Sequence, residues 1–237
     1  MSSPHAPASK RKKIVLLCVL LGIVPVGFLV MRTGKHTFKK LPYIGEREVN
    51  APGDTTFWTV PPFSFTDQNG RPFTNKDVEG KVVIADFFFT RCGSICPRMS
   101  LEMQQLQFKL DDPAFKEVVF LSHTVDPEHD TPDVLREYAR KMQADTVRWK
   151  FLTGDAKTIY RQGNIGYLLS AGPNADSTAA EQFVHSPQFV LVDMHQHIRG
   201  MYDGTVTSSV DSLVVDLKML LKEEHLRMKR EREAAAQ

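Results

Sequence analysis

The stretch that decides the fold reads VVIADFFFTRCGSICPRMSLEMQQLQFKL and spans residues 82–110. Its first eight residues are mostly β-branched or aromatic, which is typical of a strand buried on both faces. Apolar residues then recur at helical spacing, at Met99, Met103, Leu106 and Leu110. A strand that leads directly into a helix predicts an α/β domain with Cys92 and Cys96 at the junction between the two.

The downstream segments repeat this alternation of strands and helices. Buried strands are predicted over 118–123 and 149–152, and a hairpin over 189–193 and 198–202. Helices are predicted over 131–142, 155–163 and 210–221. The order predicts an α/β fold, a thioredoxin-like sandwich with a mostly parallel sheet at its centre.

An N-terminal segment differs from the rest of the chain. Residues 14–31 form an unbroken run without a charge, preceded by Lys10, Arg11, Lys12 and Lys13. The run can span a hydrocarbon core of about 30 Å, and the basic cluster predicts a cytoplasmic N-terminus. A cleaved signal peptide is the alternative. This run is longer than the apolar region of a signal peptide, and the residues after it offer no good cleavage site made of small residues. We therefore expect one transmembrane helix in the inner (cytoplasmic) membrane of a bacterium, with the C-terminal domain in the periplasm. A mitochondrial inner membrane is the alternative, although no mitochondrial targeting segment is evident before the anchor.

Composition and spacing divide the chain into five parts. We predict a cytoplasmic N-terminus at 1–13, the transmembrane anchor at 14–31, a linker at 32–56, one domain at 57–222 and a charged tail at 223–237. The formal charge of +2 over 237 residues offers no basis for nucleic-acid binding. Three cysteines are too few for a small fold that disulfides hold together.

The chemistry of the domain is expected at Cys92 and Cys96. A helix N-terminus stabilises a nearby thiolate, and two thiolates one turn apart can bind a soft metal ion such as Cu(I) or zinc. A structural disulfide and two unrelated core cysteines are the structural alternatives. A disulfide oxidoreductase is a further one, although a two-residue spacer is its usual pattern.

A third ligand is sought among His123, His129, His185, His195 and His197. His185 stands out because it precedes Ser186, Pro187 and the strand at 189–193. In a thioredoxin-like sheet, the loop before that strand lies beside the cysteine loop. A site of Cys92, Cys96 and His185 would be three-coordinate, which favours copper and leaves one face open. His195 and His197 lie in a predicted turn and are expected to be exposed.

The acidic residues and methionines near the cysteines have more ordinary interpretations. Asp126 follows a buried strand, where it could tune the site, meet a partner or serve a turn. Asp130 is expected to act in a turn or as a helix cap. Asp86 is predicted to be a structural carboxylate that supports the site, and Met99 and Met103 are expected in the core.

Three motifs in this order carry a family resemblance. They are DFFFTRCGSICP at 86–97, VDPEHDTP at 125–132 and VHSPQFVLVD at 184–193. The sequence resembles the Sco/SenC family of membrane-anchored, thioredoxin-like copper-binding proteins. The resemblance implies a Cu(I) or Cu(II) site at the matching Cys92, Cys96 and His185. The cysteine loop departs from the family pattern, because Gly93-Ser94-Ile95 stands where an acidic residue and another proline are common.

The resemblance also implies a function and partners. Family members help to assemble the binuclear copper centre of cytochrome c oxidase, so we expect a copper metallochaperone that delivers copper to that oxidase subunit or prepares it. Other copper chaperones or thiol reductants are further expected partners. The alternative is a thiol–disulfide oxidoreductase that uses Cys92 and Cys96 on an oxidase subunit or another extracytoplasmic protein. Whether the protein is an enzyme stays open. A peroxidase fits the motifs less well, and a metal-dependent sensor or interaction module is a further alternative.

Overall fold

The computed structural model describes residues 11, 21–22, 40–51, 54–173 and 183–235. The predicted anchor at 14–31 lies outside these residues apart from Leu21 and Gly22. Within the described part of the chain, no helix combines the length and the apolar character needed to cross a membrane. Residues from Lys40 onward form a compact unit of their own, and this unit carries the predicted domain.

The core of this unit is a seven-stranded mixed sheet. Its order is β11 (Ile198–Asp203), β10 (Gln188–Val192), β5 (Val82–Phe88), β6 (Val118–Thr124), β7 (Trp149–Thr153), β3 (Ser64–Asp67) and β4 (Pro72–Thr74). Strands β5, β6 and β7 are parallel, and β10 and β3 flank them in the antiparallel direction. The three central strands therefore end at one common edge, where α/β proteins usually bind their ligands.

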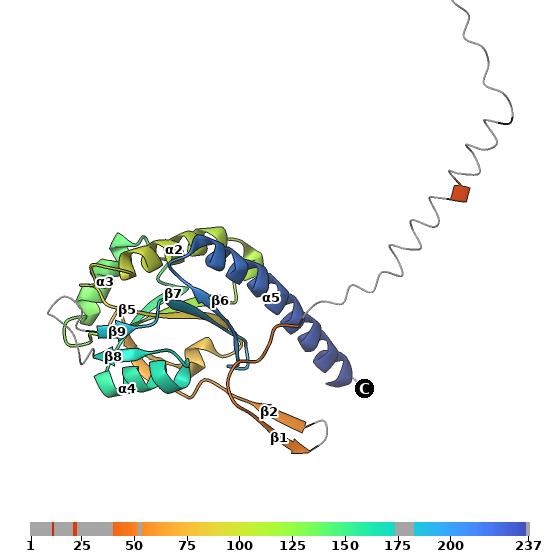
Figure 1. Ribbon diagram of the computed structural model, residues 1–237, viewed down its shortest axis with the longest axis horizontal. Helices are drawn as coiled ribbons and strands as arrows, with labels where there is room; N and C mark the ends of the chain where they lie inside the picture. Colours follow the sequence, from red (N-terminus) through yellow and green to blue (C-terminus); the bar gives the residue numbers. More distant parts are fainter. Residues whose placement is uncertain (1–10, 12–20, 23–39, 52–53, 174–182, 236–237) are drawn as a thin grey trace, which may run out of the picture. The chain divides into compact units, whose positions relative to one another are not determined.

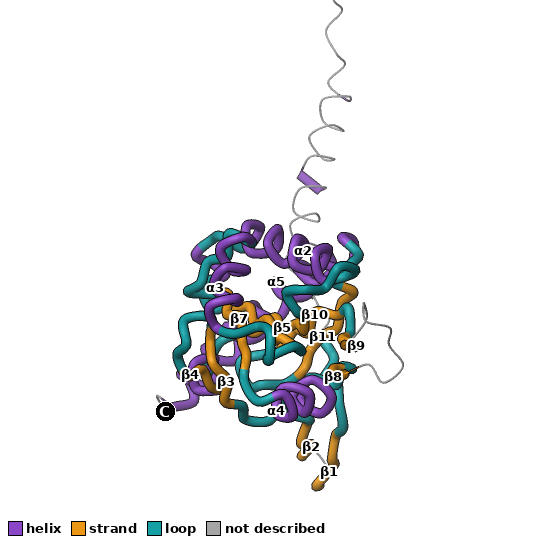
Figure 2. Tube along the Cα trace, turned by 90° about the vertical axis from the view of Figure 1, so that its left-hand side faces the viewer, coloured by secondary structure: helices purple, strands orange, loops and turns teal. Residues whose placement is uncertain are grey.

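Helices cover both faces of the sheet. Helices α2 (Cys96–Lys109), α3 (Pro132–Lys141) and α5 (Thr207–Ala235) lie over one face, and α4 (Ala156–Arg161) lies over the other (Figures 1 and 2). Short turns complete the layers: the 3-10 turns η1 (Asn75–Val78) and η2 (Pro113–Phe115), and the π-turn η3 (Gln162–Gly166). The core-facing residues of α2 and α5 are buried, including Met99 and Met103 as predicted. The predicted α/β architecture and the order of its strands and helices are confirmed. The prediction of a mostly parallel sheet is wrong, because only the pairs β5–β6 and β6–β7 are parallel and the other four pairs are antiparallel.

Two small hairpins were not predicted. Strands β1 (Arg47–Ala51) and β2 (Asp54–Phe57) pair within the segment expected to be a linker, and β8 (Ala171–Pro173) pairs with β9 (Phe183–His185). Of the segment predicted to be a linker, the structure describes residues 40–51 and 54–56. Leu41 is buried, and Ile44 pairs with Ile198 at the edge of the sheet. Gly45, in the bend before β1, has a φ of +111°, a conformation that favours glycine.

Arg199 explains why the segment packs there. Its guanidinium is fully buried and donates to Asp193 at 3.1 Å and to Glu223 at 3.0 Å. It also donates to the carbonyl oxygens of Leu41 at 2.9 Å and Pro42 at 3.1 Å. One cation thus joins the β10–β11 hairpin, helix α5 and the start of the domain, and its buried charge is neutralised by the carboxylates.

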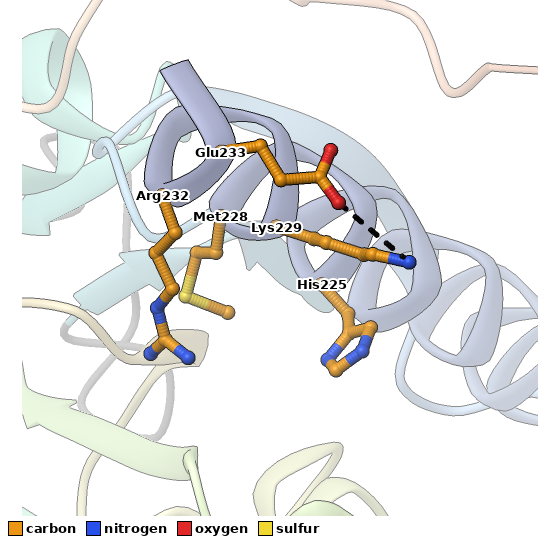
Figure 3. A pocket seen from close by; sticks show the side chains of 5 residues that line it. All are labelled: His225, Met228, Lys229, Arg232 and Glu233. Carbon is orange, nitrogen blue, oxygen red and sulfur yellow. Dashed lines mark ion pairs between the residues drawn. The ribbon is translucent and has the colours of Figure 1, made fainter. Parts of the chain in front are cut away.

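Helix α5 continues through the predicted charged tail. It reaches Ala235, and Glu224 within this extension is buried. A pocket on the last turns is lined by His225, Met228, Lys229, Arg232 and Glu233, with an ion pair of 3.9 Å between Lys229 and Glu233 (Figure 3). The pocket contains none of the predicted metal ligands. The helical extension is thus anchored to the domain by Arg199, and the metal chemistry must be sought elsewhere.

Replacement of Arg199 by Met should strongly destabilise the domain. The substitution leaves Asp193 buried without its cation, so we expect a loss of about 3–5 kcal/mol in the free energy of unfolding, measured by urea denaturation. Arg136→Met, which breaks an exposed ion pair with Asp133, is the control and should change it by less than about 0.5 kcal/mol. Equal effects of the two substitutions would contradict the role given to Arg199.

Candidate metal centre

The two cysteines lie where the sheet passes into helix α2. Strand β5 ends at Phe88, a turn closes through the 3.2 Å hydrogen bond from Cys92 N–H to the Phe89 carbonyl, and α2 begins at Cys96. Pro97 occupies the first turn of the helix, where its missing N–H costs nothing. Cys96 is therefore buried beneath the helix N-terminus, while Cys92 remains partly exposed at the mouth of the site.

His185 reaches the same edge through the antiparallel strand β10. Val190 of β10 pairs with Ala85 of β5, so the residues that precede β10 lie beyond the carboxyl end of β5. His185 also pairs with Ala171 in the β8–β9 hairpin, and Ser186 N–H donates to the Ser170 carbonyl at 2.9 Å. The backbone thus places the imidazole beside the cysteines on the other side of the loop.

The three predicted ligands come together. One ligand atom each from Cys92, Cys96 and His185 lies within 4.8 Å of the others. Cys96 Sγ is 3.0 Å from His185 Nε2, and both cysteines are free thiols. His185 is buried, with its ring edge-on to Phe89 at 5.9 Å between centroids. Two sulfurs and one imidazole nitrogen therefore converge on a point open on the side of Cys92, an arrangement that could hold a soft metal ion.

The two thiols differ in their acidity. Burial works to raise the pKa of Cys92, but hydrogen bonds with His185, Ser94 and Cys96 outweigh it and lower this pKa to about 5. Burial raises the pKa of Cys96, and the neighbouring Cys92 raises it further. At neutral pH the outer sulfur is thus a ready thiolate, whereas a metal must displace a proton from the inner one.

Asp86 lies behind the site as a buried carboxylate. Burial raises its pKa to about 6, although hydrogen bonding with Ser122 and the attraction of His185 act against this shift. Ser122 also accepts a hydrogen bond of 2.9 Å from Trp149 Nε1. Asp86 Oδ1 has no hydrogen-bond partner among the residues described. Asp86 is thus a buried carboxylate close enough to His185 and Cys96 to interact with both electrostatically.

Asp130 has a role that the sequence analysis missed. Its fully buried carboxylate accepts hydrogen bonds from Thr90 N–H at 3.1 Å, from the Thr90 hydroxyl and from the Thr124 hydroxyl. Thr131 occupies the N-cap position of α3 without a side-chain hydrogen bond. The prediction that Asp130 serves a turn or cap is wrong, because its carboxylate is directed inward to the cysteine loop.

Asp126 reaches the site through a neighbour. It is buried and forms an ion pair of 2.5 Å with Arg91, the residue before Cys92. Asp126, His129 and Asp130 also lie close enough together to surround a metal ion. Protein donors already occupy the two carboxylates, and His129 Nδ1 lies 2.9 Å from Asp130. This cluster is therefore a set of hydrogen bonds and ion pairs that hold the loops.

The remaining histidines are not part of the thiol site. His123 is buried on the opposite face of the sheet from Asp86, stacked on Phe87 at 5.0 Å, and burial lowers its pKa to about 4. His195 is exposed in the β10–β11 turn, as predicted. His197 was expected to be exposed too, but it is mostly buried because its ring contacts Asp193 at 3.2 Å.

Asn164 is another residue that sequence reasoning missed. Its side chain donates to the Ala171 carbonyl at 2.7 Å and accepts from Ala171 N–H at 3.0 Å. The Asn164 side chain thereby makes with β8 the hydrogen bonds that a neighbouring strand would make. Ala171 of β8 in turn pairs with His185. No spacing in the sequence connects Asn164 with the cysteines, although its place in a π-turn is typical of functional sites.

A mixed sheet with two thiols at a helix N-terminus and an imidazole before the antiparallel strand defines a thioredoxin-like protein with a candidate soft-metal centre. The SCO1/SenC family model matches residues 53–222, and the chain belongs to this family. It is 32% identical over 165 residues to the SCO1 protein homolog of Bacillus subtilis, which covers 70% of this chain and 84% of that relative.

Solved structures show the same fold. A SCO1/SenC family lipoprotein of Bacillus anthracis has a TM-score of 0.60 and 33% identity, covering 69% of this chain and 95% of the other. BsSco, a member of the Sco family of cytochrome c oxidase assembly proteins with a disulfide switch, has a TM-score of 0.61 and 30% identity, covering 69% and 94%. Copper-bound yeast Sco1 has a TM-score of 0.55 and 26% identity, covering 68% and 88%.

Replacement of Asp86 by Asn should stabilise the metal-free, reduced protein more as the pH rises. Because the folded-state pKa is raised from 3.8 to about 6, the wild type loses stability between these pH values and does not regain it above them. Relative to wild type, the variant should therefore gain about 3 kcal/mol in unfolding free energy from pH 3.5 to pH 8.

Urea denaturation across this range checks the expectation, with Asp133→Asn as the exposed control. If the difference in unfolding free energy between Asp86→Asn and wild type stays constant with pH, ionisation of Asp86 does not destabilise the folded protein, and the expectation is wrong.

Proposed function

We propose that this protein binds one copper ion through Cys92, Cys96 and His185 and delivers it to the binuclear copper centre of cytochrome c oxidase, or prepares that centre. The observation that carries the proposal is the convergence of two free sulfurs and one imidazole within 4.8 Å. Membership of the SCO1/SenC family supports it, as does the copper bound by the similar yeast Sco1.

The donor set suits copper for chemical reasons. Thiolates are soft ligands and imidazole is intermediate, a combination that favours Cu(I), Cu(II) or Zn²⁺ over Mg²⁺ or Ca²⁺. Three ligands at a partly buried site leave one position open, on the side of Cys92. A thiolate of an acceptor protein can enter there before a donor ligand leaves, so copper need never be released into solution.

The compartment and the partners are part of the same proposal. The uncharged run at 14–31 would anchor the protein in the inner membrane, with its N-terminus in the cytoplasm and the copper domain in the periplasm. The oxidase subunit with the binuclear copper centre would be the acceptor. Other copper chaperones would load the site, and thiol reductants would keep Cys92 and Cys96 reduced in a compartment where disulfides form.

Anaerobic titration of the reduced protein with Cu(I) tests the proposal. Wild type should bind one copper per chain, as read by mass spectrometry and by competition with a chromophoric chelator. Cys92→Ser, Cys96→Ser and His185→Ala should each reduce the affinity by about 100-fold or more, because each removes one of three ligands. His195→Ala is the matched control, since it removes an exposed imidazole outside the site. Wild-type affinity in all three ligand variants would disprove the assignment.

A thiol–disulfide oxidoreductase is the second candidate. The lowered pKa of Cys92 and the position of Cys96 one turn away favour it, because an exposed thiolate can attack a disulfide and the second thiol can resolve the mixed disulfide. Turnover of a dithiol–disulfide substrate without metal should then be abolished by Cys92→Ser. Retained copper binding with no metal-free exchange would reject this candidate and leave the first intact.

A further inference from the structure

Two consecutive residues before Cys92 are held by one loop. Thr90 N–H and its hydroxyl donate to Asp130, and Arg91 donates through Nε at 3.1 Å and through its terminal nitrogen at 2.5 Å to Asp126. Both carboxylates belong to the turn after β6. We call these contacts between 90–91 and 126–130 the clamp. Its two carboxylates are buried, so the clamp has a rigid base in the sheet.

The cysteine loop is supported on one side only. Gly93 and Ser94, which follow Cys92, are exposed, and a side chain added at Gly93 would meet no atom within 4 Å. Cys96 by contrast is fixed in the helix and buried. Cys92 therefore lies at the boundary between a held segment and an open one, directly after the clamp.

The contribution of Arg91 is one of position. Its guanidinium is directed at Asp126 in a two-pronged contact, so its charge is neutralised there. Cys92 has its own hydrogen-bond partner in Ser94, at 3.5 Å, and Arg91 contacts Asp126 instead. Arg91 acts on the site through the backbone that it shares with Cys92.

We propose that Arg91 and Asp126 are positioning residues for copper capture and release. This inference rests on the proposed copper function. With the pair intact, the Cys92 sulfur is held at the ligating position and leaves the copper only when an acceptor thiolate replaces it. In that exchange the bond between Cu(I) and the acceptor sulfur forms, and the bond between Cu(I) and Cys92 breaks. The proton that the acceptor thiol lost goes to solvent, Cys92 is left as a thiolate, and copper stays Cu(I).

Arg91→Met and Asp126→Asn test the proposal in the full chain. Each variant should release Cu(I) to a competing dithiol about 10–100-fold faster than wild type, the range typical when a residue that orients a metal ligand is lost. The double variant should be no worse than either single one, because the two side chains act as one unit. Arg91→Lys, which keeps the charge but not the two-pronged contact, should fall between wild type and Arg91→Met.

Arg98→Met is a matched control. Arg98 is 55% exposed and pairs with a nearly buried Glu102, whereas Arg91 is 50% exposed and pairs with a nearly buried Asp126. Arg98 follows the cysteine loop and does not hold it. The Cu(II)–thiolate absorption should change in Arg91→Met and stay unchanged in Arg98→Met, with thermal unfolding used to confirm that both variants fold.

The outcomes separate this inference from the proposed function. If wild type binds no copper, the proposed function fails. If wild type binds one copper per chain but Arg91→Met releases it as slowly as Arg98→Met, with the same absorption, the positioning role is disproved. Arg91 is half exposed, so its variants are expected to fold. They therefore still test the positioning role if Asp126→Asn fails to fold.

Discussion

The antiparallel pairing of β10 with β5 is the constraint on which the site depends. A parallel strand at this position would begin at the opposite edge of the sheet, and the residue before it would lie a full strand length from the cysteines. Because β10 runs the other way, its start lies at the edge where β5 ends, and His185 comes within 3.0 Å of Cys96 Sγ. The sheet thus brings together side chains 89 positions apart in the chain.

The two cysteines of the site differ in burial and in their position relative to helix α2. Cys96 is fixed in a helix and buried, so it can hold a metal ion without contact with solvent. Cys92 is partly exposed at the mouth of the site, where another protein can reach it. This asymmetry follows from their places in the chain: one residue lies within the first helical turn and the other in the loop before it. Copper transfer to an acceptor protein and thiol–disulfide exchange both require one accessible sulfur and one protected sulfur.

Much of the architecture could be predicted because it depends on local patterns. The run at 82–89 is apolar on both faces, and the stripes at 99–110 and 210–221 have a helical period, so strand, helix and order were all recognisable. Asp130 was misjudged because its neighbours in the sequence suggest a turn, while its actual partners Thr90 and Thr124 belong to two different strand ends. His197 was misjudged for the same reason, since its burial depends on contacts that its position in a turn conceals.

Periodicity, spacing and residue chemistry were enough to establish an α/β domain, the cysteine pair at a strand–helix junction and the choice of His185 among five histidines. Hydrophobic period and ligand softness are properties of short segments, whereas the choice of His185 depended on the place of its loop in the expected thioredoxin-like sheet. The three-dimensional fold was needed to show that Arg91 is bound to Asp126, that Asp130 is directed toward the cysteine loop, and that Arg199 joins residues 41–42 to α5. These contacts join distant segments through buried charges, whose partners are chosen by packing and by the need to neutralise a charge removed from water.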